Sequence, residues 1–243
     1  MHPSTTNPTN MRRIAILSIL GFLTLSASAQ SDKYIGTMEQ TISNIGQAET
    51  VEQMMALSNK FERIALAEKS EWLPYYYASF TRCLAGYMMQ DKSGVDAMMD
   101  VAQTHIDLAD SLEPGNSEIS LLKAMVLTGR MMVDPMSRGM QYGMQSSMLN
   151  QTAISQDPGN PRAYYLMGQG LFYTPPEFGG GQDKGCAMIA QALEHYATFE
   201  PASSIHPDWG QKQAEEIYAN CPQASGNESM EQEEDMEEGG EEE

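Results

Sequence analysis

The chain has three cysteines, Cys83, Cys186 and Cys221, and thiols can form disulfides, bind soft metals or act as nucleophiles. Residues 183–199 and 209–220 have the pattern of two helices joined by a short turn. In an antiparallel hairpin, residues equidistant from the turn lie side by side. The midpoint of positions 186 and 221 falls inside the turn, so the spacing predicts a Cys186–Cys221 disulfide, with Cys83 as a buried apolar residue.

A second group with chemical potential is a run of methionines at four-residue intervals: Met132, Met136, Met140, Met144 and Met148. Thioethers are soft ligands that suit Cu(I). The same spacing also marks one stripe of a helix, and methionine fills irregular cores well. No histidine or cysteine stands among the five, so we expect core packing and no metal, with copper binding as the alternative.

The histidines and the acidic residues show no catalytic grouping. His105 aligns with Phe61 and Leu149 of neighbouring repeats, which predicts an interior position, and His195 and His206 lie near the end of the array. No Ser/His/Asp or Cys/His set has catalytic spacing, although triads follow no fixed sequence order. We therefore expect no enzyme activity, no catalytic residue and no cofactor.

The segment from Thr174 to Gly181 (TPPEFGGG) is the most distinctive local sequence. Its prolines stop a helix and its glycines permit positive φ angles. A glycine loop before a helix can bind an anion, but no Lys-Ser/Thr follows, which excludes a P-loop. A shaped turn with Phe178 packed on the core and a functional loop both remain open.

These residues are positioned by a repeated helix. Four anchors, Lys69, Glu113, Asp157 and Glu200, are spaced 44, 44 and 43 residues apart, and each is followed by Ser or Pro. Eleven and four residues before the first three anchors stand small residues, whereas the fourth unit has bulky ones: Ser58/Ala65, Ala102/Ala109, Ser146/Ala153 and Ile189/Tyr196. Such a period predicts an array in which each unit buries its apolar face against its neighbours.

The small-residue pattern and the acidic-Pro turns resemble those of tetratricopeptide repeats in exported bacterial proteins, over about residues 50–200. The resemblance implies an all-α, right-handed α-solenoid of about four antiparallel helix pairs plus a C-terminal helix. Helix formers and N-cap signals at Asn116, Asn160, Asp134 and Asp208 support this interpretation. The expected helices are 33–46, 50–68, 72–89, 94–112, 116–132, 135–156, 160–173, 183–199 and 209–220.

In the resembled family, the first helix of each pair lines a concave groove that binds peptides. The matching positions here are Tyr77, Thr81, Leu121, Met125, Arg162, Tyr165, Gln169 and Tyr173. We therefore expect a non-catalytic protein-binding or scaffold module that recognises a peptide or protein segment. The alternative is a small-ligand or solute adaptor of a periplasmic transport system. The structural alternative is that these side chains pack against the preceding repeat or that a terminal helix folds into the groove.

The two ends have their own signals. Met11-Arg12-Arg13, the apolar run 14–25 and Ala27-Ser28-Ala29 have the layout of a secretory signal, so residues 1–29 are expected to be an upstream extension and a cleaved signal. Residues 30–222 form the predicted repeat domain, and the Glu-rich residues 223–243 an acidic disordered tail. Export to the periplasm or outside follows. A net charge of −19 argues against nucleic-acid partners, and signal cleavage leaves no membrane span.

Overall fold

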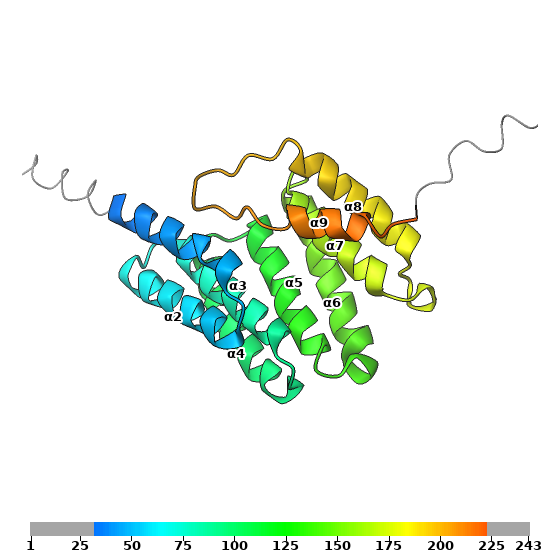
Figure 1. Ribbon diagram of the computed structural model, residues 1–243, viewed down its shortest axis with the longest axis horizontal. Coiled ribbons are helices and arrows are strands. Elements are labelled where there is room, and N and C mark those ends of the chain that lie inside the picture. The colour runs from blue at the N-terminus through cyan, green and yellow to red at the C-terminus, as the bar shows by residue number, and fades with distance from the viewer. Residues whose placement is uncertain (1–31, 223–243) are drawn as a thin grey trace, which may run out of the picture.

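The computed structural model describes residues 32–222, and all regular elements in this range are helices (Figure 1). Residues 32–43 form a first helix, followed by a short 3-10 turn η1 (Ile45–Gln47). The longer helices after it are α2 (Val51–Ala67), α3 (Trp72–Met88), α4 (Val95–Leu112), α5 (Ser117–Met131), α6 (Pro135–Gln156), α7 (Pro161–Tyr173), α8 (Gln182–Tyr196) and α9 (Gln211–Tyr218). Two further 3-10 turns are η2 (Lys92–Gly94) and η3 (Pro176–Phe178).

The helices pack as sequential antiparallel pairs, as the repeat pattern predicts. Each helix from α2 to α9 contacts the next one, and the first helices of successive pairs, α3, α5 and α7, also contact one another. Figure 1 shows them following one another across the molecule, from blue to yellow. Within residues 32–222, no helix has the length and apolar character needed to cross a membrane.

Small residues lie where the helices cross. Ser58, Ala65, Ala102, Ala109 and Ala153 are completely buried. The Ser58 hydroxyl donates to the carbonyl of Ala78 on the paired helix at 2.8 Å. A serine can therefore occupy this buried position because its hydroxyl is satisfied by a backbone carbonyl that helix packing brings close.

The fourth pair departs from the small-residue pattern, and the structure shows how the change is compensated. Ile189 of α8 is fully buried against Gly168 of α7. A Cβ on Gly168 would lie 2.9 Å from Ile189 side-chain atoms, and one on Gly185 would lie 2.6 Å from the Phe172 Cβ. At this crossing the small residue, Gly168, is on α7, and the bulky residue, Ile189, is on α8. The two helices can therefore still approach closely.

The predicted N-caps are confirmed at three helices and wrong at one. Asn116, Asp134 and Asn160 accept backbone hydrogen bonds at the starts of α5, α6 and α7. Asp208, however, does not cap the last helix. That helix begins at Gln211 after Gly210, which has φ of 107°. The left-handed residue ends the preceding segment, and Trp209 is directed into the protein instead of starting a helix.

The expected signal peptide at 1–29 and the acidic tail at 223–243 lie outside the described residues. The repeat domain expected at 30–222 has its described part at 32–222.

Candidate functional site

A C-terminal segment crosses the face formed by α3, α5 and α7. We call residues 197–210, between α8 and α9, the strap. Figure 1 shows the strap in gold and orange, extending from the end of α8 toward the N-terminal helices and returning to α9. Ile205 and Pro207 are buried and Trp209 is half-buried. Ile205 joins the main core, so the strap is part of the fold and covers the face predicted to be open.

Trp209 is the centre of this contact. Its indole stacks on Phe80 of α3, with centroids 4.9 Å apart and an interplanar angle of 23°. It meets Tyr165 of α7 edge-on at 6.4 Å. The indole N–H donates to the Tyr76 hydroxyl at 2.9 Å, and the Trp209 carbonyl accepts from the Tyr196 hydroxyl, also at 2.9 Å. Aromatic side chains from two helices therefore form a slot that holds one flat ring.

A buried ion pair lies beneath the slot. Arg162 Nε and Nη2 donate to Glu118 Oε1 at 2.8 and 2.6 Å. Asn160 Nδ2 donates to the same oxygen at 2.6 Å, and the Tyr76 hydroxyl donates to Glu118 Oε2 at 3.3 Å. The guanidinium carbon of Arg162 lies 4.5 Å from the Phe199 ring centroid and 5.9 Å from that of Trp209. The pair thus connects α5, α7 and the strap.

The electrostatics of this region follow from burial and pairing. Burial disfavours the charged form of Arg162, but the Glu118 carboxylate outweighs it and raises the pKa of Arg162 above its ordinary value. Burial raises the pKa of Tyr165 to about 12, so its phenol stays neutral at physiological pH. Arg162 Nη1 is buried and has no hydrogen-bond partner among residues 32–222. The face formed by α3, α5 and α7 therefore contains one charged donor, Arg162 Nη1, without an acceptor in the described residues.

Part of the predicted strip on α7, formed by Arg162, Tyr165, Gln169 and Tyr173, is brought together. Arg162 and Tyr165 both contact Trp209, and Gln169 Nε2 donates to the Tyr165 hydroxyl at 2.9 Å. Tyr173, at the end of the same helix, is 70% exposed. Arg162 and Tyr165 are buried, so in this conformation only the Gln169–Tyr173 end of the strip reaches solvent.

Tyr77, Leu121 and Met125 are also buried, and they face the core between helices instead of an open groove. Tyr77 stacks on Phe61 of α2 at 5.2 Å, and Leu121 packs with Ala153 and Ala163. Thr81, the remaining predicted position on α3, is buried as well. On α3 the slot is lined by Tyr76 and Phe80, one position before Tyr77 and Thr81. One residue rotates a helix position by about 100°, which moves a side chain from one face to the next.

Glu118 and Trp209, like Tyr76 and Phe80, are not among the predicted site residues. Glu118 follows the N-cap Asn116 by two positions, and an acid in a first turn is ordinarily explained by the helix dipole. Trp209 lies in a segment predicted to begin a helix. Its signal was available, because the chain has only 2 tryptophans and this one precedes a glycine.

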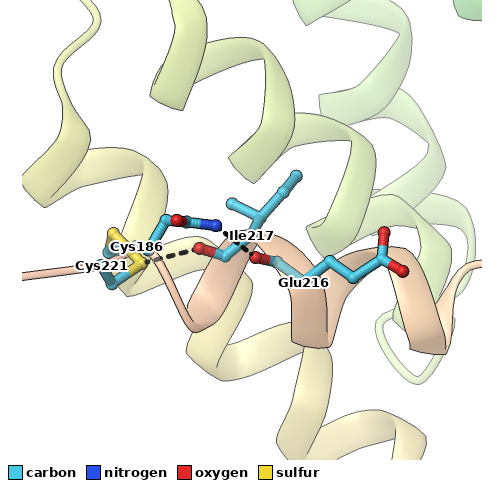
Figure 2. The surroundings of a disulfide bond; sticks show 5 residues. Cys186, Glu216, Ile217 and Cys221 are labelled. Carbon is cyan, nitrogen blue, oxygen red and sulfur yellow. Dashed lines mark hydrogen bonds between the residues drawn. A yellow bond between two sulfur atoms is a disulfide. The ribbon is translucent and has the colours of Figure 1, made fainter.

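The predicted disulfide between Cys186 and Cys221 is present, with Cα atoms 5.8 Å apart. It fastens the end of α9 to the start of α8 (Figure 2). Ile217 and Glu216 of α9 lie beside it, and the Ile217 carbonyl is 3.7 Å from the Cys221 sulfur. Cys83 is free and buried, as expected.

The Thr174–Gly181 segment is a shaped turn. Gly179 and Gly181 have φ of 88° and 120°, and a Cβ on Gly180 would collide with the Thr174 carbonyl. Lys184 Nζ donates to the Gly179 carbonyl at 3.0 Å. The part of the shaped-turn hypothesis that packs Phe178 onto the core is wrong, because Phe178 is 70% exposed.

The methionine stripe is also placed differently from the expectation of core packing. Met136, Met140, Met144 and Met148 are 95%, 76%, 63% and 67% exposed on α6. His105 is buried, as expected, 3.6 Å from Glu62. Among residues 32–222, no group of three or more His, Cys, Asp or Glu side chains gathers in a way that could hold a metal ion.

Comparison with known proteins gives an informative structural match. No protein-family model matches the chain, and no curated protein matches it either. The structure is similar to that of the HusA haemophore from Porphyromonas gingivalis, with a TM-score of 0.72 and 32% sequence identity. The match covers 77% of this chain and 92% of the haemophore chain.

The matched protein is a haemophore, a binding protein and not an enzyme, and this agrees with the non-catalytic character expected from the sequence. Identity of 32% over almost the whole length of the solved protein is a relationship of both sequence and fold. The chain therefore belongs to the family of the HusA haemophore.

Proposed function

We propose that this protein is an exported, non-catalytic carrier of haem. The observation that carries the proposal is the 32% identity to the HusA haemophore over 92% of that chain. This identity favours the small-ligand hypothesis over the hypothesis of peptide binding. Export is supported by the signal layout of residues 1–29.

We assign the ligand to the face of α3, α5 and α7 around the strap. Haem is a flat, largely apolar ring that carries carboxylate side groups. Phe80, Tyr76 and Tyr165 offer aromatic surfaces of the kind that line ligand sites, and the buried donor of Arg162 offers a partner for a carboxylate. We place Gln169 and the exposed Tyr173 at the rim of this site, where it meets solvent.

Peptide binding in a concave groove is supported less well. The chain's own strap and α9 lie across the face where a peptide would bind, and they bury Arg162 and Tyr165. We also propose that the helix pairs wind as a right-handed α-solenoid of tetratricopeptide type, which the contacts among α3, α5 and α7 support.

The test is a titration of the purified mature protein with ferric haem, followed by the absorbance of the haem Soret band. A saturable change at one defined stoichiometry, with a complex that survives gel filtration, is the expected result. Parallel titration with metal-free protoporphyrin separates contacts to the ring and carboxylates from any contact to iron. A protein that shows no saturable Soret change would contradict the proposal.

A matched variant tests the assigned face. Tyr173→Ala removes an exposed rim side chain and is expected to weaken haem binding by about 1–2 kcal/mol without lowering the melting temperature. Tyr218→Ala, also an exposed aromatic but on the outer end of α9, is the control and should bind haem like the wild type. Equal effects of the two variants would move the site away from this face.

A further inference from the structure

We infer that Trp209 is an internal occupant of the ligand slot and that haem binds by displacing it; this inference rests on the proposed haem-carrying function. The indole lies where a flat aromatic ligand would be held. Phe80 stacks on one side of it at 4.9 Å, and Tyr165 meets it edge-on at 6.4 Å. These are the contacts by which aromatic side chains hold any planar π-system.

The polar groups around the slot are arranged for a ligand that the indole replaces only in part. The indole N–H satisfies the Tyr76 hydroxyl, but Trp209 offers no acceptor side-chain atom to Arg162. Arg162 Nη1 therefore remains buried and unpaired, although Arg162 is only 2% exposed. A carboxylate of haem would satisfy this donor, which gives the ligand one interaction that the internal occupant lacks.

The Glu118 carboxylate does not satisfy the unpaired Nη1 donor of Arg162. Both of the donors that Arg162 gives to Glu118, Nε and Nη2, are directed to Oε1. Asn160 donates to the same oxygen, and the Tyr76 hydroxyl donates to the other. The carboxylate is thus held by neutral donors as well as by Arg162, so its pairing does not require Nη1.

The strap can leave its place without unfolding the helices around it. It is attached mainly by the buried side chains of Ile205 and Pro207, by Trp209, and by the contact of Phe199 with Arg162. Two hydrogen bonds add to this: the Trp209 indole N–H donates to the Tyr76 hydroxyl, and the Tyr196 hydroxyl donates to the Trp209 carbonyl. A segment held by a few side chains opens at a lower free energy than a helix that is packed along its length. Gly210, with φ of 107°, is the last residue of the strap and directly precedes α9.

Helix α9 stays in place while the strap moves. Ala214 and Ile217 are buried against α7 and α8, and the Cys186–Cys221 disulfide fixes the end of the helix. Trp209 is therefore tethered on both sides, by α8 before it and by α9 after it. The strap can open and close again without loss of register.

This arrangement makes a quantitative prediction. If the binding-competent form is the one with Trp209 displaced, apparent haem affinity is reduced by the fraction of molecules that are open, and removal of the indole restores it. Trp209→Ala should therefore bind ferric haem roughly tenfold more tightly than the wild type. Trp209→Phe, which loses the N–H bond but keeps a ring, should show a smaller gain in the same direction.

The experiment compares these variants with Tyr218→Ala in Soret titrations, after circular dichroism has established that each is folded. Hydrogen exchange of the wild type with and without haem is the second measurement. Haem should accelerate exchange of strap amides while it protects α3 and α7. If Trp209→Ala does not fold, the haem affinity of Trp209→Phe and the exchange data decide whether haem displaces Trp209.

The possible outcomes are distinct. Equal or weaker haem binding by the Trp209 variants, or slower exchange in the strap on haem binding, would overturn the inference and make Trp209 a permanent wall of the site, with the haem-carrying function intact. Absence of any Soret change in the wild type would instead overturn the proposed function itself, and the inference with it.

Discussion

The two halves of the molecule hold their helices together by different means. Between α2 and α5 one continuous apolar core runs from Phe61 and Tyr76 to Ile106 and Val126. Around α7, α8 and α9 the buried apolar cluster is much smaller: Tyr165, Ile189, Ala192, Tyr196, Ala214 and Ile217. The second half adds a disulfide, and a buried ion pair between Arg162 of α7 and Glu118 of α5 ties it to the first half. Helix packing in the second half is therefore stabilised by a few specific bonds, whereas packing in the first half is stabilised by buried apolar area.

The sharpest test of this difference removes the charge of Glu118. Glu118→Gln leaves the Arg162 guanidinium buried without its carboxylate, and such a loss costs about 3–5 kcal/mol of unfolding free energy. Chemical denaturation measures it. Asp110→Asn breaks the more exposed pair with Lys123 and should cost no more than about 1 kcal/mol. If both variants lose the same small amount of unfolding free energy, the ion pair does not hold the second half to the first.

The disulfide comes next in expected size. Replacing Cys186 and Cys221 by serine removes a cross-link between residues 35 apart, and chain-entropy arguments give about 3–4 kcal/mol for a loop of this length. The loss should be local. Hydrogen exchange should accelerate in α9 and the strap, and the amides of α3 should keep their protection. Uniform acceleration in both halves would show that they unfold as one unit.

A pair of glycines in α7 tests packing at the crossing with α8. Gly168→Ala places a methyl 2.9 Å from Ile189, and such overpacking costs about 1–3 kcal/mol. Gly170→Ala, in the same helix, meets nothing within 4 Å and should stabilise by about 0.5–1 kcal/mol. Melting temperatures that move in opposite directions are expected. A Gly168→Ala protein as stable as the wild type would mean that the two helices can separate slightly.

The smallest effect concerns pH in the first half. Burial lowers the pKa of His105, and the nearby Glu62 carboxylate only partly opposes this, while Arg82 adds to it. Below the ordinary histidine pKa of about 6.5, the unfolded chain therefore binds a proton that the folded chain resists, so stability falls as pH decreases from about 7 to 5. His105→Gln should reduce this decrease in thermal denaturation. A pH dependence unchanged by the substitution would assign it to other groups.

The sequence predicted most of the fold because helix signals are local. Asn116 and Asn160 identify helix starts by a hydrogen bond within two residues, and α6 has the predicted bounds 135–156. The Cys186–Cys221 bond was predictable for a related reason, because two helices of a hairpin fix which positions meet.

The site was predicted less well, because its residues meet through tertiary contacts. The resemblance placed Arg162 and Tyr165 on one face, and both contact Trp209. On α3 it named Tyr77, whereas the residue that contacts Trp209 is Tyr76, because a shift of one residue changes the face on which a side chain lies. Trp209 reaches Tyr76 from 133 residues away. No periodic pattern in the sequence indicates that the strap crosses to α3, and the closed face follows from that crossing.

The disulfide has one more consequence, for proteolysis. A protease cut anywhere between Cys186 and Cys221 would give two peptides that remain one covalent molecule. Exposed strap residues such as Ser204 and Asp208 are the kind of site where nicking begins. A nicked protein would keep α9 attached and would separate into fragments only after reduction. The ring from 186 to 221 therefore lets the molecule survive a cut in the strap as one covalent unit.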